Sequence, residues 1–233
     1  RLVHDFRQRI DDNVFFLQGR CLSSGTTTPF LPFIEVVRSS FRIGEGASRT
    51  EAERRLARGL ETLGIALEET LPYLLNLLGH EVAPDVVQTI DSEAIGVRTR
   101  NALLTLLRER RRISPVILFI DDLHWMDNAS EQLLGRICSE NRDLPLLLIC
   151  AYRPGYATPW RTREGVDEIG LDQLSPGGTE EMLQSRLEVD EVPGDLARLV
   201  AERAQGNPLF AEEIIGYLVD RGAVSVTESG VSY

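Results

Sequence analysis

Two adjacent aspartates, Asp121 and Asp122, end an apolar run in the segment VILFIDDLHWMDNAS, which covers residues 116–130. Two neighbouring carboxylates repel each other unless a cation or a bound proton relieves the repulsion. A hard divalent ion is the natural partner of such a pair, and Mg²⁺ with a nucleoside triphosphate fits best. The alternative is an ordinary strand end whose aspartates cap the next helix. The residue types therefore indicate either a magnesium–nucleotide site or a helix cap.

The apolar runs around these acids predict an α/β fold with a parallel sheet. Residues 116–121 and 145–151 are continuous apolar stretches, which is typical of strands covered by helices on both faces. Ligands of such sheets lie beyond the carboxyl ends of the strands. Asp121 and Asp122 are therefore expected at the ligand edge of the sheet.

The rest of the chain alternates between helical and strand patterns. Thr50 with Glu53, and Asn128 with Glu131, have the spacing of capping boxes at helix starts. The tail, 222–233, is interpreted as the first half of a β-hairpin. The other expected strands are 13–22, 144–152 and 168–171, and the expected helices are 1–10, 30–42, 50–64, 71–79, 92–111, 128–141, one opened by Ser175 and Pro176, 193–204 and 208–221.

Composition narrows the class of protein. The 233 residues have a formal net charge of −11 and contain no lysine, because the Lys+Arg total of 25 equals the number of arginines. This charge disfavours direct binding of nucleic acid, whose affinity grows with the number of cationic contacts. No apolar run approaches the roughly 18 residues of a membrane span. Cys21, Cys138 and Cys150 lack zinc-site or disulfide spacing. We therefore expect a cytoplasmic protein with no nucleic-acid or membrane partner.

Several segments, taken in order, resemble one family. VILFIDDLHWMDNAS resembles the Walker B segment of STAND-type P-loop ATPases, the signal-transduction branch related to AAA proteins, and LLLICAYRPGY resembles their sensor-1 strand. AERAQGNPLFAEEIIGYLVDRGAV resembles their helical lid. FLQGRCLSSGTTTPFLPFIEVV and LPYLLNLLGHE are similar to ATPase regions fused to class III adenylate or guanylate cyclases and to LuxR-type regulators. The resemblance implies an NTPase core over 1–172, a lid over 173–221 and the truncated start of a winged-helix-like hairpin over 222–233.

The resemblance also implies ATP and Mg²⁺ as cofactors and assigns roles to residues. Asp121 would hold Mg²⁺ through a water molecule, and Asp122 would be the general base. Many AAA-type ATPases have Glu at the second position, so the shorter Asp implies slow turnover. Read alone, position 153 also fits a surface-loop arginine, and 206–208 also fit a helix-starting turn. The implied nucleotide contacts are Arg153 at the γ-phosphate and Gly206, Asn207 and Pro208 at the adenine.

One motif of the family is missing from these residues. A P-loop ATPase needs G-x-x-x-x-G-K-[ST], and a sequence without lysine cannot contain it. The family commonly follows this motif with a run such as RLV, which opens this sequence. We therefore expect a fragment that starts just after the Walker A motif, lacks the first strand, and by itself binds ATP poorly and hydrolyses it negligibly. The absent strand would lie between 145–151 and 168–171, where an aggregation-prone core is expected.

Two functions remain open at this point. In the first, the parent protein is an ATP-dependent regulatory switch that acts on an effector domain in the same chain, such as a cyclase, DNA-binding or TPR-like region. In the second, the domain is a nucleotide-independent scaffold that retains the NTPase fold for protein contacts. The sequence does not choose between them, because the effector lies outside these residues.

Overall fold

The structure is a computed structural model that describes residues 2–81, 92–139, 145–158, 160–161, 163–227 and 230–233. The chain divides into two compact units, Arg1–Val166 and Asp167–Tyr233. Each unit has its own hydrophobic core. Across the part of the chain that is described, none of the helices has the length and apolar character that a membrane span requires.

The first unit contains a three-stranded parallel sheet, which confirms the predicted fold class. Strands β1 (Phe15–Arg20), β2 (Val116–Asp121) and β3 (Leu146–Cys150) lie in the order β1-β2-β3. The apolar residues of β2, the central strand, are buried on both faces, as expected for a parallel strand in a sheet covered on its faces. Strand β3 pairs only with β2 among the described strands, and Leu147 on its outer face is 49% exposed.

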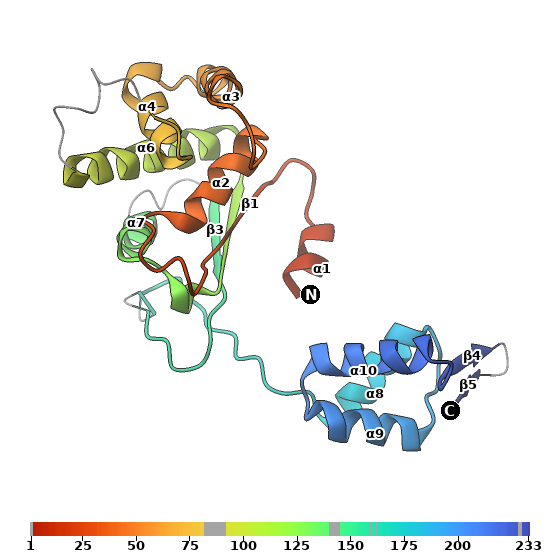
Figure 1. Ribbon diagram of the computed structural model, residues 1–233. Coiled ribbons are helices and arrows are strands. Elements are labelled where there is room, and N and C mark those ends of the chain that lie inside the picture. The colour runs from red at the N-terminus through yellow and green to blue at the C-terminus, as the bar shows by residue number, and fades with distance from the viewer. Residues whose placement is uncertain (1, 82–91, 140–144, 159, 162, 228–229) are drawn as a thin grey trace. The chain divides into compact units, whose positions relative to one another are not determined.

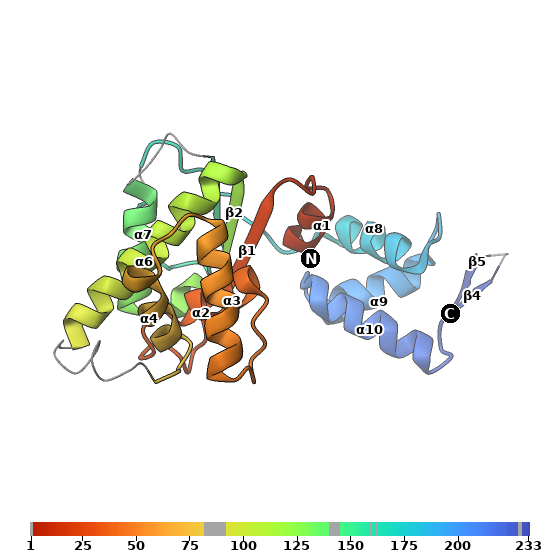
Figure 2. The ribbon, with the colours of Figure 1, turned by 90° about the horizontal axis from the view of Figure 1, so that it is seen from above.

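Helices lie on both faces of this sheet (Figures 1 and 2). On one face, Leu17 and Leu118 share an apolar gap with residues of helices α2 (Leu31–Phe41), α6 (Ser92–Ile113) and α7 (Asn128–Ser139). Helix α2 comes so close to β1 that a Cβ on Gly19 would lie 2.3 Å from the Pro32 carbonyl oxygen, so only glycine fits there. Helix α1 (Leu2–Gln8) lies on the other side of β1, with the Arg7 guanidinium 5.1 Å from the centre of the Phe16 ring.

A helical layer completes the first unit (Figure 1). Helices α3 (Arg49–Thr62) and α4 (Leu67–Leu77) pack on each other, and α4 packs on α6. Their apolar stripes bury Leu56, Leu60 and Leu74 completely. Helix α6 is amphipathic over its 22 residues and leads, after a two-residue turn, directly into β2. The layer is therefore connected to the strand that carries the two aspartates.

Both predicted capping boxes are wrong by one or two residues. The N-cap of α3 is Ser48, whose hydroxyl accepts a hydrogen bond from the Glu51 amide, so Thr50 lies inside the first turn. The cap of α7 is provided by Asp127, and Asn128 is the first residue of that helix. In each case the true cap lies one or two residues earlier. Ser and Asp side chains accept hydrogen bonds from the unpaired amides of the first helical turn, just as Thr and Asn side chains can.

Two predicted strands also differ from the structure. Residues 168–171 form no strand, and Ile169 and Leu171 are 82% and 73% exposed. An extended segment becomes a strand only where a neighbour completes its backbone hydrogen bonds, and no described segment does so here. The tail is not half a hairpin: β4 (Ser225–Thr227) and β5 (Gly230–Ser232) pair as a complete antiparallel ribbon.

The second unit is a three-helix bundle followed by this ribbon. Helices α8 (Pro176–Leu187), α9 (Gly194–Ala204) and α10 (Pro208–Asp220) all pack on one another. Ser175 caps α8 as predicted, because its hydroxyl accepts a hydrogen bond from the Gly178 amide. The core of the bundle is formed by apolar residues of the three helices and the segments that flank them: Leu183, Val192, Leu196, Ala197, Val200, Ala204, Ala211, Ile215 and Val224.

Candidate functional site at the carboxyl edge of the sheet

The three strands end side by side at one edge of the sheet. The Cys21 amide donates to the Asp121 carbonyl oxygen over 3.0 Å, which continues the pairing of β1 and β2. The Ala151 amide donates to the Ile120 carbonyl oxygen over 3.0 Å, which continues the pairing of β2 and β3. Residues that follow the strands therefore meet at this edge, where parallel sheets bind their ligands. The charged residues there are Arg20, Asp121, Asp122 and Arg153.

Asp121 is half-buried at the end of the central strand. Its Oδ1 atom accepts a hydrogen bond of 2.9 Å from the amide of Asp122. Its Oδ2 atom has no hydrogen-bond partner within the described residues, so one carboxylate oxygen is held and the other is available. The Asp121 carboxylate can therefore bind a cation without first breaking an ion pair.

Asp122 is oriented by a residue that the sequence did not single out. The Nε and Nη2 atoms of Arg20, the last residue of β1, donate to Asp122 Oδ2 over 3.1 and 3.0 Å. The backbone of Asp122 has a φ of 54°, in the left-handed region that Asp tolerates better than most residues, and the 3₁₀ turn Leu123–Trp125 follows it. The pair is exposed and contributes little to stability, so its main effect is to fix the direction of the carboxylate.

The two aspartates change the pKa of the Arg20 guanidinium. The pKa of Arg20 is raised, first by its side-chain hydrogen bonds to Asp122, then by the charge of Asp122 and that of Asp121. One signal in the sequence could have identified it. In a parallel sheet, the residue that ends one strand lies beside the residue that ends the next, and Arg20 is in register with Asp121.

Arg153 lies in the segment that follows the carboxyl end of β3. It follows β3 by three residues, at the start of a turn in which the Tyr156 amide donates to the Arg153 carbonyl oxygen and Gly155 has a φ of 93°. Its side chain is exposed and makes no ion pair or hydrogen bond with the residues described. The guanidinium is therefore free for an anion that approaches this edge.

Asp127 is the second important residue that the sequence analysis did not single out. Its carboxylate is 4% exposed and accepts hydrogen bonds from the Phe30 amide (3.1 Å), the Ser130 amide (2.9 Å) and the Ser130 hydroxyl (2.6 Å). It thus caps α7 and at the same time ties the loop after β1 to that helix. Phe30, which has a φ of 61°, is held at the start of α2 by this contact. The signal in the sequence was an aspartate directly before a helical pattern.

The predicted adenine contacts lie in the second unit. Gly206 has a φ of 75°, and a Cβ at this position would lie 2.8 Å from the Gln173 Cβ and the Leu174 carbonyl oxygen. The Asn207 side chain accepts from the Leu209 amide and caps α10, and Pro208 occupies the first turn. Local structure thus explains all three residue types as a helix start, and their contact with adenine stays a prediction.

The thiols near the site are protonated. Burial raises the pKa of Cys21 to about 12, and the nearby charges of Asp127, Asp122 and Asp121 act in the same direction. Burial also raises the pKa of Cys150 to about 12, and it raises that of Cys138. All three are free thiols. They therefore act as small apolar groups of the core rather than as nucleophiles.

These pKa shifts predict slow alkylation and a loss of stability in alkali. At pH 8 a thiol whose pKa is about 12 instead of 9.0 has roughly a thousandfold less thiolate, so iodoacetamide should label Cys21 and Cys150 roughly a thousandfold more slowly than in the unfolded chain. The folded state keeps these protons between pH 9 and 12, where unfolded thiols lose them, so stability present below pH 9 should decrease across that range. Mass spectrometry of labelled peptides measures the first effect, and rapid labelling of either residue in native protein would contradict the assignment.

Comparisons with known proteins identify the family of the first unit. Residues 1–149, more than half of the 233, match the AAA ATPase domain, and residues 178–232 match a domain of unknown function. An uncharacterized protein of Rhizobium meliloti (strain 1021) is 26% identical over 222 residues, and the match covers 92% of this chain and 21% of that protein.

The chain thus spans about a fifth of the length of that relative. Among solved structures, a mutant of Thermotoga maritima RuvB is similar, with a TM-score of 0.40 and 19% sequence identity. The match covers 79% of this chain and 61% of that one, and so weak a likeness supports no argument. The match over residues 1–149 shows that this chain belongs to the AAA ATPase domain family.

Proposed function

We propose that this chain is the ATP-binding module of a regulatory switch of the STAND type, in which bound nucleotide controls an effector domain of the same larger protein. The observation that carries the proposal is the charge arrangement at the carboxyl edge. Asp121 ends the buried central strand and Asp122 follows it, where Arg20 pairs with Asp122. Arg153 lies three residues beyond the end of β3 and is exposed. Membership of an ATPase family supports ATP as the ligand of that edge. Effector domains of the cyclase or transcription-regulator kind are part of the proposal, as is a cytoplasmic location.

The residues present fit a magnesium ion. Mg²⁺ keeps most of its water and is held in ATPases by one or two carboxylates together with substrate phosphates. Asp121 offers one free carboxylate oxygen, and the described residues contain no group of three or more His, Cys, Asp or Glu that could hold a metal without a ligand's help. Asp121 would therefore hold the hydrated ion, which when bound offsets negative charge on the phosphates.

Asp122 is proposed as the general base of a slow hydrolysis. It would accept a proton from the water that attacks the terminal phosphorus, while the bond from that phosphorus to the bridging oxygen breaks to give ADP and phosphate. Arg20 holds Oδ2 of Asp122, and Oδ1 has no partner in the described residues. Arg20 would thus be a positioning residue. The short Asp side chain favours slow turnover, because a displacement of about 1 Å can reduce a rate roughly a hundredfold.

The phosphates need further binding groups. The 233 residues contain no G-x-x-x-x-G-K-[ST] motif, so the proposed site requires a phosphate-binding loop from another part of the larger protein. Arg153 is proposed to bind the γ-phosphate, because a planar guanidinium forms paired hydrogen bonds with phosphate oxygens. Gly206, Asn207 and Pro208 are proposed to contact the adenine.

A nucleotide-independent scaffold is the second candidate. One observation favours it: Arg20 already neutralises Asp122 without any nucleotide, so the pair has a structural explanation. The two proposals differ in what ATP does, because a scaffold has no affinity for it. A switch must also distinguish ATP from ADP, since a ligand shifts a conformational equilibrium only through differential affinity.

Replacing Arg153 by alanine tests the switch. In the larger protein, the variant should lose about 10- to 100-fold in affinity for ATP and little in affinity for ADP, because one charge-assisted contact to the γ-phosphate is removed. Equilibrium titration of both nucleotides, followed by tryptophan fluorescence, measures the ratio. Arg163→Ala is the matched control in the same loop region. Equal losses for ATP and ADP would contradict the role of Arg153, and no binding of either nucleotide by the unaltered protein would favour the scaffold.

A further inference from the structure

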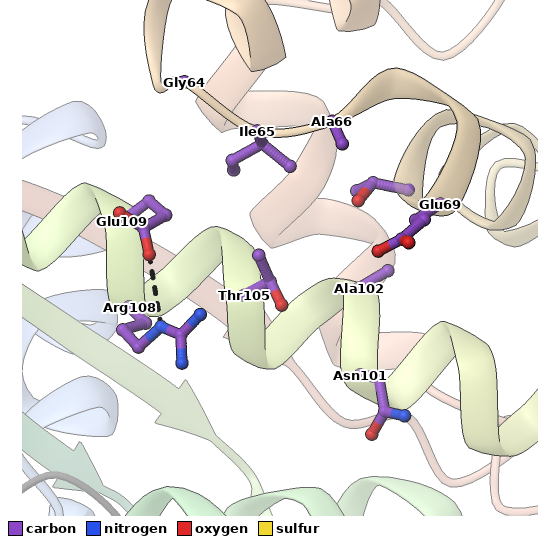
Figure 3. Close-up of a pocket in the computed structure, with 10 residues that line it drawn as sticks. Gly64, Ile65, Ala66, Glu69, Asn101, Ala102, Thr105, Arg108 and Glu109 are labelled. Atoms are coloured by element: carbon purple, nitrogen blue, oxygen red, sulfur yellow. Dashed lines mark hydrogen bonds and ion pairs between the residues drawn. The ribbon is translucent and has the colours of Figure 1, made fainter.

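Among the described residues, the polar cavity of the helical layer has no charged side chain that requires a ligand. The cavity has a volume of about 220 Å³ and lies between α6 and the segment that joins α3 to α4 (Figure 3). Its charged residues Glu69 and Arg108 are exposed to solvent. Glu109 already accepts hydrogen bonds from Arg108 and Arg112. The second unit, in contrast, combines an uncovered apolar surface with a strong negative charge.

Helix α10 carries large apolar side chains that the bundle does not cover. The helix packs on α8 and α9 through its buried side, where Ala211 and Ile215 lie in the core (Figures 1 and 2). Away from these two helices, Leu209, Phe210 and Tyr217 are 60%, 56% and 59% exposed. Single exposed apolar residues are ordinary, but a group of them on one helix marks an interaction site.

Two carboxylates lie among these apolar side chains. Residues three or four apart are neighbours on a helix surface, so Glu213 lies between Leu209 and Tyr217. Asp220 lies three residues beyond Tyr217. Both acidic residues are exposed, and neither side chain forms an ion pair or hydrogen bond with another described residue. We call Leu209, Phe210, Glu213, Tyr217 and Asp220 the α10 face.

The whole second unit is acidic. From Asp167 to Tyr233 the sequence has 14 Asp and Glu residues and 4 arginines, a formal charge of −10, so the first unit carries only −1 of the total of −11. This charge repels nucleic acid and anionic membrane surfaces, which are also negative. It repels a second copy of the unit for the same reason. The charge of the α10 face is therefore complementary to a cationic protein.

The spacing along the α10 face matches a helix as the partner. Phe210 and Tyr217 are seven residues apart, a rise of roughly 10.5 Å, and Glu213 and Asp220 have the same spacing. A seven-residue repeat is the interval at which one helix packs along another. The Tyr217 ring also has a demonstrated affinity for cations within the chain, because the Arg221 guanidinium lies 5.2 Å from the ring centre.

We propose that the α10 face binds a cationic amphipathic helix of a separate partner protein. Apolar residues of that helix cover Phe210 and Tyr217, and its lysine or arginine residues pair with Glu213 and Asp220. A large net charge accelerates the encounter of free molecules, whereas a segment of the same chain reaches its site through a high effective concentration without such steering. The charge of the unit therefore favours a separate protein. The α10 face needs no nucleotide, so its test is independent of the proposed ATPase function.

A designed peptide tests the proposal. A fluorescent peptide of about 18 residues, with a leucine stripe at helical spacing and lysine on both sides of it, should bind the chain at about 0.1 M salt. Phe210→Ala and Tyr217→Ala should each weaken binding about 10- to 100-fold, because aromatic side chains dominate interfaces. Val219→Ala is the matched control, since Val219 is an exposed apolar residue of α10 two positions beyond Tyr217 and faces another direction. Unchanged thermal unfolding would show that each variant folds.

Charge variants and altered peptides distinguish docking from general attraction. Glu213→Gln should weaken binding about 3- to 10-fold. Glu181→Gln removes the same charge from an exposed position on α8 and should change binding less than about twofold. A peptide of the same composition without the leucine stripe should bind at least about tenfold more weakly than the striped peptide.

Four results would overturn the proposal. The first is no binding of the striped peptide at about 1 mM, a concentration that detects even weak complexes. The second is an equal loss of binding in Val219→Ala and Phe210→Ala. The third is binding of the chain to phosphatidylcholine vesicles that Phe210→Ala abolishes, which would assign the face to a membrane. The fourth is binding of the peptide to this chain but not to the larger protein, which would assign the face to a segment of the same protein.

Discussion

Replacing Asp127 by alanine is expected to lower the free energy of unfolding of the first unit by about 3–4 kcal/mol. The substitution removes the acceptor of three hydrogen bonds and leaves the Phe30 amide and both Ser130 donors buried without a partner. The loop after β1 and the start of α7 should loosen together. Urea unfolding followed by tryptophan fluorescence measures the loss, because Trp125 and Trp160 both lie in this unit.

Two further variants distinguish the effect of losing the cap from general effects of substituting a residue in this turn. Asn128→Ala, at the residue that the sequence pattern favoured as the cap, should change the free energy of unfolding by less than about 0.5 kcal/mol. Asp127→Asn keeps a carbonyl oxygen for the two amides and should cost about 1–2 kcal/mol, between the other two variants. Equal losses for Asp127→Ala and Asn128→Ala would show that Asp127 does not hold the loop and the helix together.

Replacing Asp122 by asparagine is expected to reduce ATP hydrolysis by the larger protein by a factor of about 10² to 10⁴. The amide has nearly the same shape as the carboxylate but cannot accept the proton of the attacking water. Affinity for ATP should be nearly unchanged, because Asp122 acts on the water rather than on the nucleotide. Acid-quenched single-turnover reactions, in which ADP is quantified before product release matters, measure the chemical step directly.

Arg20→Gln is the companion measurement. Arg20 contacts Asp122 and no proposed substrate atom, so its loss should reduce the hydrolysis rate less than Asp122→Asn does. If Arg20 acts only through Asp122, adding Arg20→Gln to Asp122→Asn should cause little further loss, because coupled residues are not additive. A double variant with fully multiplied losses would contradict the positioning role. Unchanged hydrolysis in Asp122→Asn would remove it as the base.

The sheet could be predicted from sequence because its signal is local. Continuous apolar runs predicted β2 and β3, and both form as parallel neighbours. The segment 168–171 has only two large apolar residues, Ile169 and Leu171, which alternate with Glu168 and Gly170, and it forms no strand. Whether it pairs depends on a neighbouring strand rather than on its own residues. Helices were predicted well where an amphipathic stripe is long, as in α6.

The site could be predicted only in part because its contacts are not local. Asp121 and Asp122 were identified by their position after an apolar run. Arg20 was missed because its partner is 102 residues further along the chain, and only the parallel register brings the two together. Asp127 was missed because its neighbour Asn128 fits the capping pattern equally well, and the contact with the Phe30 amide depends on tertiary structure. Register within the sheet is therefore the information that the sequence pattern lacks.

The central claim is that the two aspartates at the end of β2 face a magnesium–ATP site, and equilibrium binding tests it most directly. Titrating a fluorescent ATP analogue into the larger protein, with Mg²⁺ and with EDTA, should show binding that depends on Mg²⁺. Asp121→Ala should weaken that binding by about 10- to 100-fold with Mg²⁺ present and leave the EDTA titration unchanged. Magnesium-independent binding, or equal affinity of the Asp121→Ala variant and the unaltered protein, would contradict the claim.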